Sequence, residues 1–266
     1  MAVFTDVPDY EPEPEPPPRP FKPWAALAAF MVTISVLLVL LTRLPGDQLA
    51  SPEELAQNFE RMALRAGGLR TWDTPLRIAL VGKGAGDYTP IVAEAAARFS
   101  ALSGLDATIA PQGAETFNVV IELVPDREYG LIAARVGANE QSAEYLAEHT
   151  LCYTVTQIQN VRARRATVVI PYDSPAYEIE ACIWHELMHV FGFQAHPKGI
   201  ASALLAERRM TRNDMVLLRT LYDPRLRRGS RDEMMERARA IIADHARTVQ
   251  YARDPLAALS VSGRTP

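Results

Sequence analysis

Hydrophobic and polar residues follow two different periods along this chain, and the two periods predict a mixed order of helices and strands. Short apolar runs rich in β-branched residues predict strands at residues 75–82, 117–124, 152–159 and 165–172. Longer periodic stretches predict helices at residues 52–66, 91–104, 142–148 and 175–191, and two more that begin after Thr211 and Ser230. This order is typical of an α/β or α+β domain with a mixed sheet.

Residues at the ends of these segments support the predicted boundaries. Ser51 and Glu54 have the spacing of a capping box at the start of the first helix, and Gly104 follows the end of another. The glycine-rich stretch 81–87 follows a strand, but its lysine precedes the glycine cluster. A phosphate-binding loop needs the lysine after the glycines, so we predict a tight turn here. We expect residues 254–266 to form a flexible tail.

The first part of the chain differs from the rest. Residues 1–22 are rich in proline and acidic residues, which predicts a disordered arm. Residues 23–42 carry no charge, and a helix of about 20 such residues spans the hydrocarbon core of a bilayer. We therefore predict one uncleaved transmembrane anchor. Arg19 and Lys22 precede it and Arg43 alone follows it directly, which favours a cytoplasmic N-terminus.

Composition and charge limit what the remaining chain can be. The chain has 266 residues, of which 48% are hydrophobic, and this is enough for one folded domain, which we place at residues 47–253. The net charge is −4, and no basic stripe with interleaved aromatic residues is present, which argues against a nucleic-acid binder. In the favoured orientation this domain lies outside the cytoplasm.

The chain has two cysteines, Cys152 and Cys182. An oxidising compartment would let them pair, and closing a loop of this length stabilises a domain by roughly 3–4 kcal/mol. Two buried free thiols are the alternative. Neither cysteine belongs to a C-x-x-C pair, so a thioredoxin-like or zinc-knuckle role has no support.

The sequence "HELMHVFGFQAHP" contains three of the five histidines of the chain. His185 and His189 are four residues apart on a predicted helix, so both imidazoles lie on one face and can bind one Zn²⁺ ion. Glu186 is adjacent and can act as the general base for an attacking water. Gly192 is suited to end the helix, and His196 after it is the candidate third ligand.

Other candidate ligands lie further away. Glu207, on a segment downstream of the motif, is an alternative third ligand that resembles the downstream glutamate of gluzincin peptidases. The acidic partner usual in those enzymes four residues further on is Thr211 here, so we favour His196. His149 and His245 are far from the motif in sequence, and we treat them as ordinary surface histidines.

The motif resembles that of the metzincin zinc peptidases, H-E-x-x-H-x-x-G-x-x-H. His185, Glu186, His189 and Gly192 match it, whereas His196 lies four residues after the glycine instead of three. The resemblance implies a metzincin-like mixed sheet with an active-site helix, C-terminal helices, and zinc-dependent hydrolysis of peptide bonds. Metzincins also place a methionine beneath the zinc.

In this chain, Leu204 stands where the sequence "SAL" would place that methionine, and Met210 is the other candidate. More closely, the chain resembles a bacterial family known as domain of unknown function 2927. The stretches that carry this resemblance are "RTWDTPLRIALVG", Cys152, "ACIWHELMHVFGF" and "DMVLLRTLYDPRLRRG", and it covers about residues 50–245. The resemblance implies a metzincin-like fold in an exported or anchored protein.

Two functions are the main hypotheses, and a zinc ion that only stabilises the fold is a third reading, disfavoured because structural sites have four protein ligands and at most three candidates lie near the helix. The first is a zinc-dependent metallopeptidase in the bacterial inner membrane, single-pass, with its C-terminal domain in the periplasm and a peptide or protein as substrate. The second is a non-catalytic module of the cell envelope that keeps the peptidase fold for binding or scaffolding. In either case the proline-rich arm would be available to a partner in the cytoplasm.

Overall fold

The computed structural model describes residues 30, 31, 33, 48–65, 68–111, 113–135, 150–205, 207–226 and 229–261. The chain divides into two compact units, residues 1–44 and residues 45–266. In the first unit Phe30, Met31 and Thr33 are helical, and the rest of the predicted arm and anchor lies outside the described residues. Among the residues that are described, none of the helices has the length and apolar character needed to cross a membrane.

The second unit is built around a five-stranded mixed sheet with the strand order β2-β1-β3-β5-β4. Its strands are β1 (Leu76–Gly82), β2 (Ala107–Ile109), β3 (Val119–Val124), β4 (Tyr153–Gln159) and β5 (Arg162–Pro171). Strands β1, β2, β3 and β5 run parallel, and β4 pairs antiparallel with β5 at the edge. The central strands are nearly continuous hydrophobic runs because helices cover parts of both faces.

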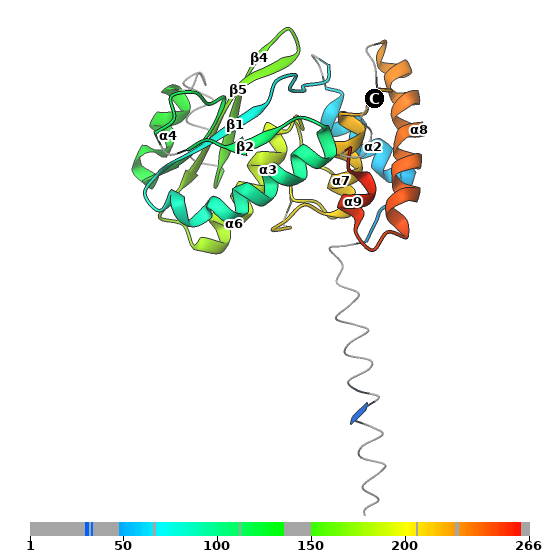
Figure 1. Ribbon diagram of the computed structural model, residues 1–266, viewed down its shortest axis with the longest axis horizontal. Helices are drawn as coiled ribbons and strands as arrows, with labels where there is room; N and C mark the ends of the chain where they lie inside the picture. Colours follow the sequence, from blue (N-terminus) through cyan, green and yellow to red (C-terminus); the bar gives the residue numbers. More distant parts are fainter. Residues whose placement is uncertain are drawn as a thin grey trace, which may run out of the picture. The chain divides into compact units, whose positions relative to one another are not determined.

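The described residues of the second unit form seven α-helices and one short 3₁₀-helix. They are α2 (Pro52–Ala63), η2 (Ala85–Tyr88), α3 (Thr89–Ser103), α4 (Asp126–Arg135), α6 (Ala176–Val190), α7 (Arg212–Leu221), α8 (Arg231–Gln250) and α9 (Pro255–Leu259). Figure 1 shows α2, α7, α8 and α9 grouped on the side of this unit away from α4. The mixed α/β class expected from the sequence is confirmed.

The two faces of the sheet carry two hydrophobic cores. On β5, Val168 and Ile170 pack into the large core shared with α3 and α6, whereas Val169 packs with Tyr129 of α4 in a smaller core. Successive side chains of a strand point to opposite faces, so α4 covers the face opposite to α3 and α6. Helix α6 therefore lies directly against the sheet, beneath its β5–β4 edge.

Several helix and strand ends are where the sequence predicts them. Ser51 and Glu54 form the expected capping box at α2, and Gly104 ends α3 with a positive φ of 77°. Within the stretch 81–87, residues 81–82 end β1, residues 83–84 form a tight turn in which Gly84 has φ 74°, and residues 85–87 belong to η2. The β4–β5 hairpin turns at Asn160 and Val161, so residues 162–164 belong to β5 and not to the longer turn implied by the two predicted strands.

Three elements were not predicted, namely β2, α4 and α9. Strand β2 has only three residues, too few to show a period, and α4 has ten residues with Gly130 in its interior, which weakens the local helix signal. The predicted helix at 142–148 lies outside the described residues.

The expectation of a flexible tail from residue 254 does not hold for residues 254–261. Asp254 caps α9, Leu259 is buried, and the Val261 N–H donates to the carbonyl of Ala101 at 2.8 Å. Contacts with residues far away in sequence order this segment, and such contacts leave no local signal. The last five residues lie outside the described part.

Candidate metal centre

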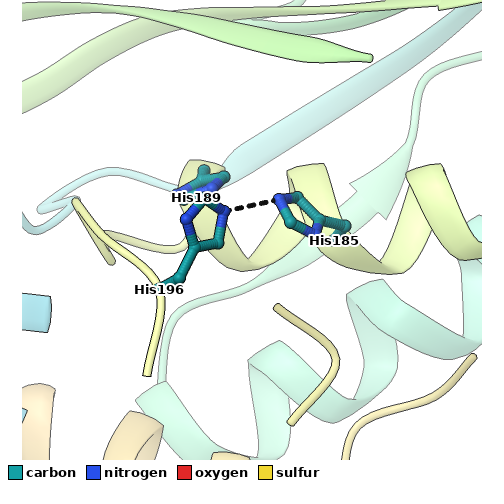
Figure 2. A group of neighbouring side chains, drawn as sticks. All are labelled: His185, His189 and His196. Carbon is teal, nitrogen blue, oxygen red and sulfur yellow. Dashed lines mark hydrogen bonds between the residues drawn. The ribbon is translucent and has the colours of Figure 1, made fainter. Parts of the chain in front are cut away.

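Three histidine side chains converge on one point beside the sheet edge. His185 and His189 project from the same face of α6, one turn apart, and His196 reaches them from the loop that follows (Figure 2). Their candidate ligand atoms all lie within 4.8 Å of one another. The Nε2 atoms of His185 and His196 face each other at 3.0 Å.

The turn after α6 brings the third histidine back to the helix. Gly192 has φ 123°, and a Cβ atom at this position would lie 2.2 Å from the carbonyl oxygen of Arg70. Only glycine combines this backbone conformation with so close an approach. The chain can therefore reverse at Gly192, and His196 returns over the helix.

Gln194 fixes the same loop to the end of α2. Its backbone and side-chain nitrogens donate to carbonyl oxygens of three residues, Met62, Ala63 and Gly68. Beyond His196, the Lys198 N–H donates to the Asn58 side chain of α2, so the loop is held on both sides of His196 and accommodates the one extra residue between Gly192 and His196. The structure thus brings His196 to the other two histidines despite the longer spacing.

The histidines are prepared to offer lone pairs to an ion. The Nδ1 atom of His189 lies 2.8 Å from the carbonyl oxygen of Phe193, so Nδ1 carries the proton and Nε2 has a free lone pair. Burial, with a contribution from the neighbouring imidazoles, lowers the pKa of His185 to about 3. Burial likewise lowers the pKa of His189 to about 4, and it lowers the pKa of His196. All three rings are therefore neutral at pH 7.

Glu186 lies behind the histidines, between α6 and the edge strand. It is 3% exposed, and its Oε2 atom accepts a hydrogen bond from the Thr154 hydroxyl at 2.7 Å. Burial raises the pKa of Glu186 to about 7, although the hydrogen bond from Thr154 opposes this shift. A carboxyl group in this range can exchange a proton near neutral pH.

A cavity of about 590 Å³ opens over this cluster. Its walls include the three histidines, Glu186, Arg70 and Glu207, together with the exposed side chains of Leu151 and Leu205. Glu207 thus lies in the same cavity as the histidines, but the group of converging ligand atoms found among the described residues does not contain it. The geometry favours His196 over Glu207 as a third ligand.

The donor set fits a tetrahedral metal ion with one open position. Zinc binds imidazole nitrogens at about 2.0–2.1 Å, which in a tetrahedron separates the nitrogens by about 3.3 Å. The 3.0 Å separation of the two Nε2 atoms is close to this value. Three neutral nitrogen ligands beside a cavity would leave the fourth position to water or substrate.

Some residues of this region could not be identified from sequence patterns. No sequence motif predicts the contact of Thr154 with Glu186. The one signal is that Thr154 follows Cys152 by two residues, so the two side chains face the same side of the strand. The disulfide between Cys152 and Cys182, which the sequence left open against free thiols, is present and joins the start of β4 to α6. This bond lies in the wall of the cavity.

The expectation for His245 was wrong. Its side chain is 12% exposed, and its Nε2 atom lies 3.1 Å from a carboxylate oxygen of the buried Asp223, next to Arg225. His245 lies on α8 and Asp223 lies in the segment after α7, so this contact joins two segments and the sequence distance from the zinc motif could not reveal it. His149 lies outside the described residues.

Comparison with protein-family models finds one that matches residues 52–241, described as a protein of unknown function, DUF2927. Comparisons with curated proteins and with solved structures found no match. The matched range covers most of the chain, from the start of α2 into α8, and it contains all three histidines and the disulfide. The chain therefore belongs to the DUF2927 family of proteins of unknown function.

Proposed function

We propose that this protein is a membrane-anchored, zinc-dependent hydrolase that cleaves peptide bonds outside the cytoplasm. The observation that carries this proposal is the convergence of His185, His189 and His196 at the wall of a cavity, with Glu186 beside them. When bound, zinc supplies a Lewis acid that lowers the pKa of a bound water to about 7. The three histidines would hold it through neutral nitrogens.

The carboxylate of Glu186 has the role of general base in this proposal. It accepts a proton from the attacking water and returns the proton to the leaving amine of the cleaved peptide bond. Its place on α6 directly after His185 would put it beside a metal ion held by the histidines without making it a ligand. The cavity would give a peptide substrate access to the histidine cluster and to Glu186.

The finer fold assignment is part of the same proposal. A metzincin-like arrangement is supported by the helix that carries two ligands, the glycine turn after it and a third ligand from the following loop. The mixed sheet with an antiparallel edge strand next to the helix also agrees with it.

The disulfide supports a location outside the cytoplasm, because disulfides persist in oxidising compartments. We propose that residues 23–42 anchor the chain in the bacterial inner membrane with the arm, residues 1–22, in the cytoplasm. Deleting residues 23–42 should release the chain from the membrane fraction on cell fractionation. A chain that remains fully membrane-bound after this deletion would contradict the anchor.

The enzymatic proposal is tested on the full-length chain purified in detergent. We expect about one zinc per chain by metal analysis, and hydrolysis of casein or of peptides derived from peptidoglycan. Glu186→Gln should retain zinc and lose roughly 100-fold or more in kcat, since general-base catalysis contributes at least this much. Glu180→Gln, on the same helix but outside the cavity lining, is the matched control.

Unchanged activity in the Glu186→Gln protein would contradict the role of this carboxylate. A wild-type chain that binds no zinc and hydrolyses neither substrate would favour the non-catalytic binding module.

A further inference from the structure

Two adjacent links join the edge strand β4 to the helix that carries the histidines. The first is the Cys152–Cys182 disulfide, with its Cα atoms 5.9 Å apart. The second is the hydrogen bond from the Thr154 hydroxyl to Glu186, with an oxygen–oxygen distance of 2.7 Å. The same hydroxyl also lies 3.3 Å from the backbone carbonyl oxygen of Glu186.

The spacing of the four residues explains why the links are adjacent. Cys152 and Thr154 are two residues apart, so both side chains point to the α6 side of the strand, whereas Tyr153 between them packs against α4 on the other side. Cys182 and Glu186 are four residues apart, so they lie on one face of α6, one turn from each other. Strand β4 and helix α6 therefore run side by side, and the Cys152–Cys182 and Thr154–Glu186 contacts follow each other along them.

Glu186 depends on this strand for its orientation. Among the described residues, Thr154 is the one side chain that donates a hydrogen bond to the Glu186 carboxylate. Glu186 is 3% exposed, so solvent reaches only a small part of its side chain. A glutamate side chain has several rotatable bonds, and a catalytic base needs its oxygen within hydrogen-bond reach of the reacting water.

We propose that Thr154 is a positioning residue for Glu186 and that the Cys152–Cys182 disulfide acts through it by fixing β4 in register with α6. This inference rests on the proposed function, since it assigns a role in the same hydrolytic site. Thr154 is not one of the converging ligand residues, and its role in this proposal is to orient the carboxylate of Glu186. The disulfide fixes the distance between the backbones of β4 and α6 two residues before Thr154 along the chain.

The first test compares variants of the full-length chain in the hydrolysis assay. Thr154→Val keeps the shape of the side chain but removes the donor, and it should lower kcat roughly 10- to 100-fold with little change in KM and with zinc content retained. Thr154→Ser restores the hydroxyl and should recover most of the activity.

Thr220→Val serves as the matched structural control. The Thr220 hydroxyl is fully buried in α7 and donates at 2.7 Å to the carbonyl of Val216, so its loss removes an equally short hydrogen bond at a residue outside the cavity lining. We expect this variant to lower thermal stability and to leave kcat unchanged. Equal kcat values for Thr154→Val and wild type would overturn the proposal.

The second test asks whether the disulfide acts through Thr154. The double variant Cys152→Ala/Cys182→Ala should lower kcat when Thr154 is present. In the Thr154→Val background, the same double substitution should lower kcat little further, because substitutions that act through one contact do not have additive effects. Full additivity of the two losses would overturn the assigned role of the disulfide, even if the double variant is less stable.

A binding measurement makes the test independent of turnover. Acetohydroxamic acid binds zinc and donates a hydrogen bond to a neighbouring carboxylate, so we expect Thr154→Val to weaken its binding to the zinc-loaded chain several-fold. A wild-type chain without zinc binding would defeat the proposed function. A zinc-loaded wild type that binds the probe no better than Thr154→Val would defeat the positioning role alone.

Discussion

At the scale of single residues, we expect a change at a buried charged residue to alter stability more than a change at an exposed one. Asp223 is 4% exposed and joins Arg225 and His245 through hydrogen bonds of 2.9 to 3.1 Å. Burial alone would raise the pKa of Asp223, but the hydrogen bonds from His245 and Arg225 outweigh it and hold the pKa well below its usual range. This group connects α7 to α8, remote from the histidine cluster.

We expect Asp223→Asn to lower the free energy of unfolding by about 3 kcal/mol at pH 7, as in other buried pairs that lose one partner. Because the native pKa of Asp223 is depressed, its contribution is fully present above the unfolded pKa of about 3.9. The contribution is lost as pH falls through the native pKa.

The difference in the free energy of unfolding between wild type and Asp223→Asn should therefore shrink steadily as pH falls below about 4. Urea unfolding at pH 7 and at pH 3 measures it, with Asp87→Asn on the exposed turn as control. A difference that grows toward acid pH would contradict the assignment.

Gly192 is a residue whose backbone conformation determines the site. Gly192→Ala would place a Cβ atom 2.2 Å from the Arg70 carbonyl oxygen at a φ of 123°. The loop must then move, so we expect a stability loss of about 2 kcal/mol or more and weaker zinc binding through displacement of His196.

Gly199→Ala is the control for Gly192→Ala. Its φ is 74° but its surroundings are open, so we expect a loss of about 1 kcal/mol and unchanged zinc affinity. Zinc titration and thermal melting of both variants make the comparison. If both variants bind zinc as tightly as wild type, the Gly192 turn does not position His196.

At the scale of elements, the same capping motif occurs in different surroundings. Ser230 caps α8 in an exposed position, whereas Thr211 caps α7 where both it and Asp214 are buried. Asp214 also accepts hydrogen bonds from the Ser202 hydroxyl and from the backbone N–H of Ala203. The cap of α7 thus fixes the loop that runs beneath the cavity.

We expect Ser230→Ala to cost about 1 kcal/mol, the usual value for an N-cap. Thr211→Ala should cost about 2–3 kcal/mol because it also removes a donor from a buried carboxylate. Chemical denaturation of both variants measures the difference. Equal losses would show that burial of Asp214 adds nothing to the cap.

At the scale of the whole molecule, the proposed zinc ion should couple to folding. An ion that binds only the folded state stabilises it by about 4 kcal/mol at a thousandfold excess over its Kd. We therefore expect EDTA to lower the melting temperature and zinc to restore it. Calorimetry with and without chelator measures the shift.

Variants separate the two candidate third ligands. His196→Ala should abolish the zinc-dependent shift, whereas Glu207→Gln should keep it, because Glu207 lies outside the converging group. The reverse result would identify Glu207 as the ligand. A wild-type melting temperature that does not respond to zinc or EDTA would contradict a bound metal.

Much of this molecule could be predicted from local patterns. The four longer strands, the helices α2, α3, α6, α7 and α8, and the candidate site on α6 all follow from residues close in sequence. Periodicity, capping residues and the four-residue spacing of His185 and His189 act within one or two turns of chain, so the sequence is enough to identify them.

Other features depend on residues that only the fold brings together. The convergence of His196 on the helix requires Arg70 and α2 to hold its loop, and the orientation of Glu186 requires Thr154 on a different strand. The order of α9 and the burial of His245 likewise come from packing against distant helices. The sequence by itself determined the elements and the chemistry of the histidine motif, because these depend on neighbours along the chain. Only the tertiary structure decided which side chains meet, because a contact between distant segments has no fixed spacing in sequence.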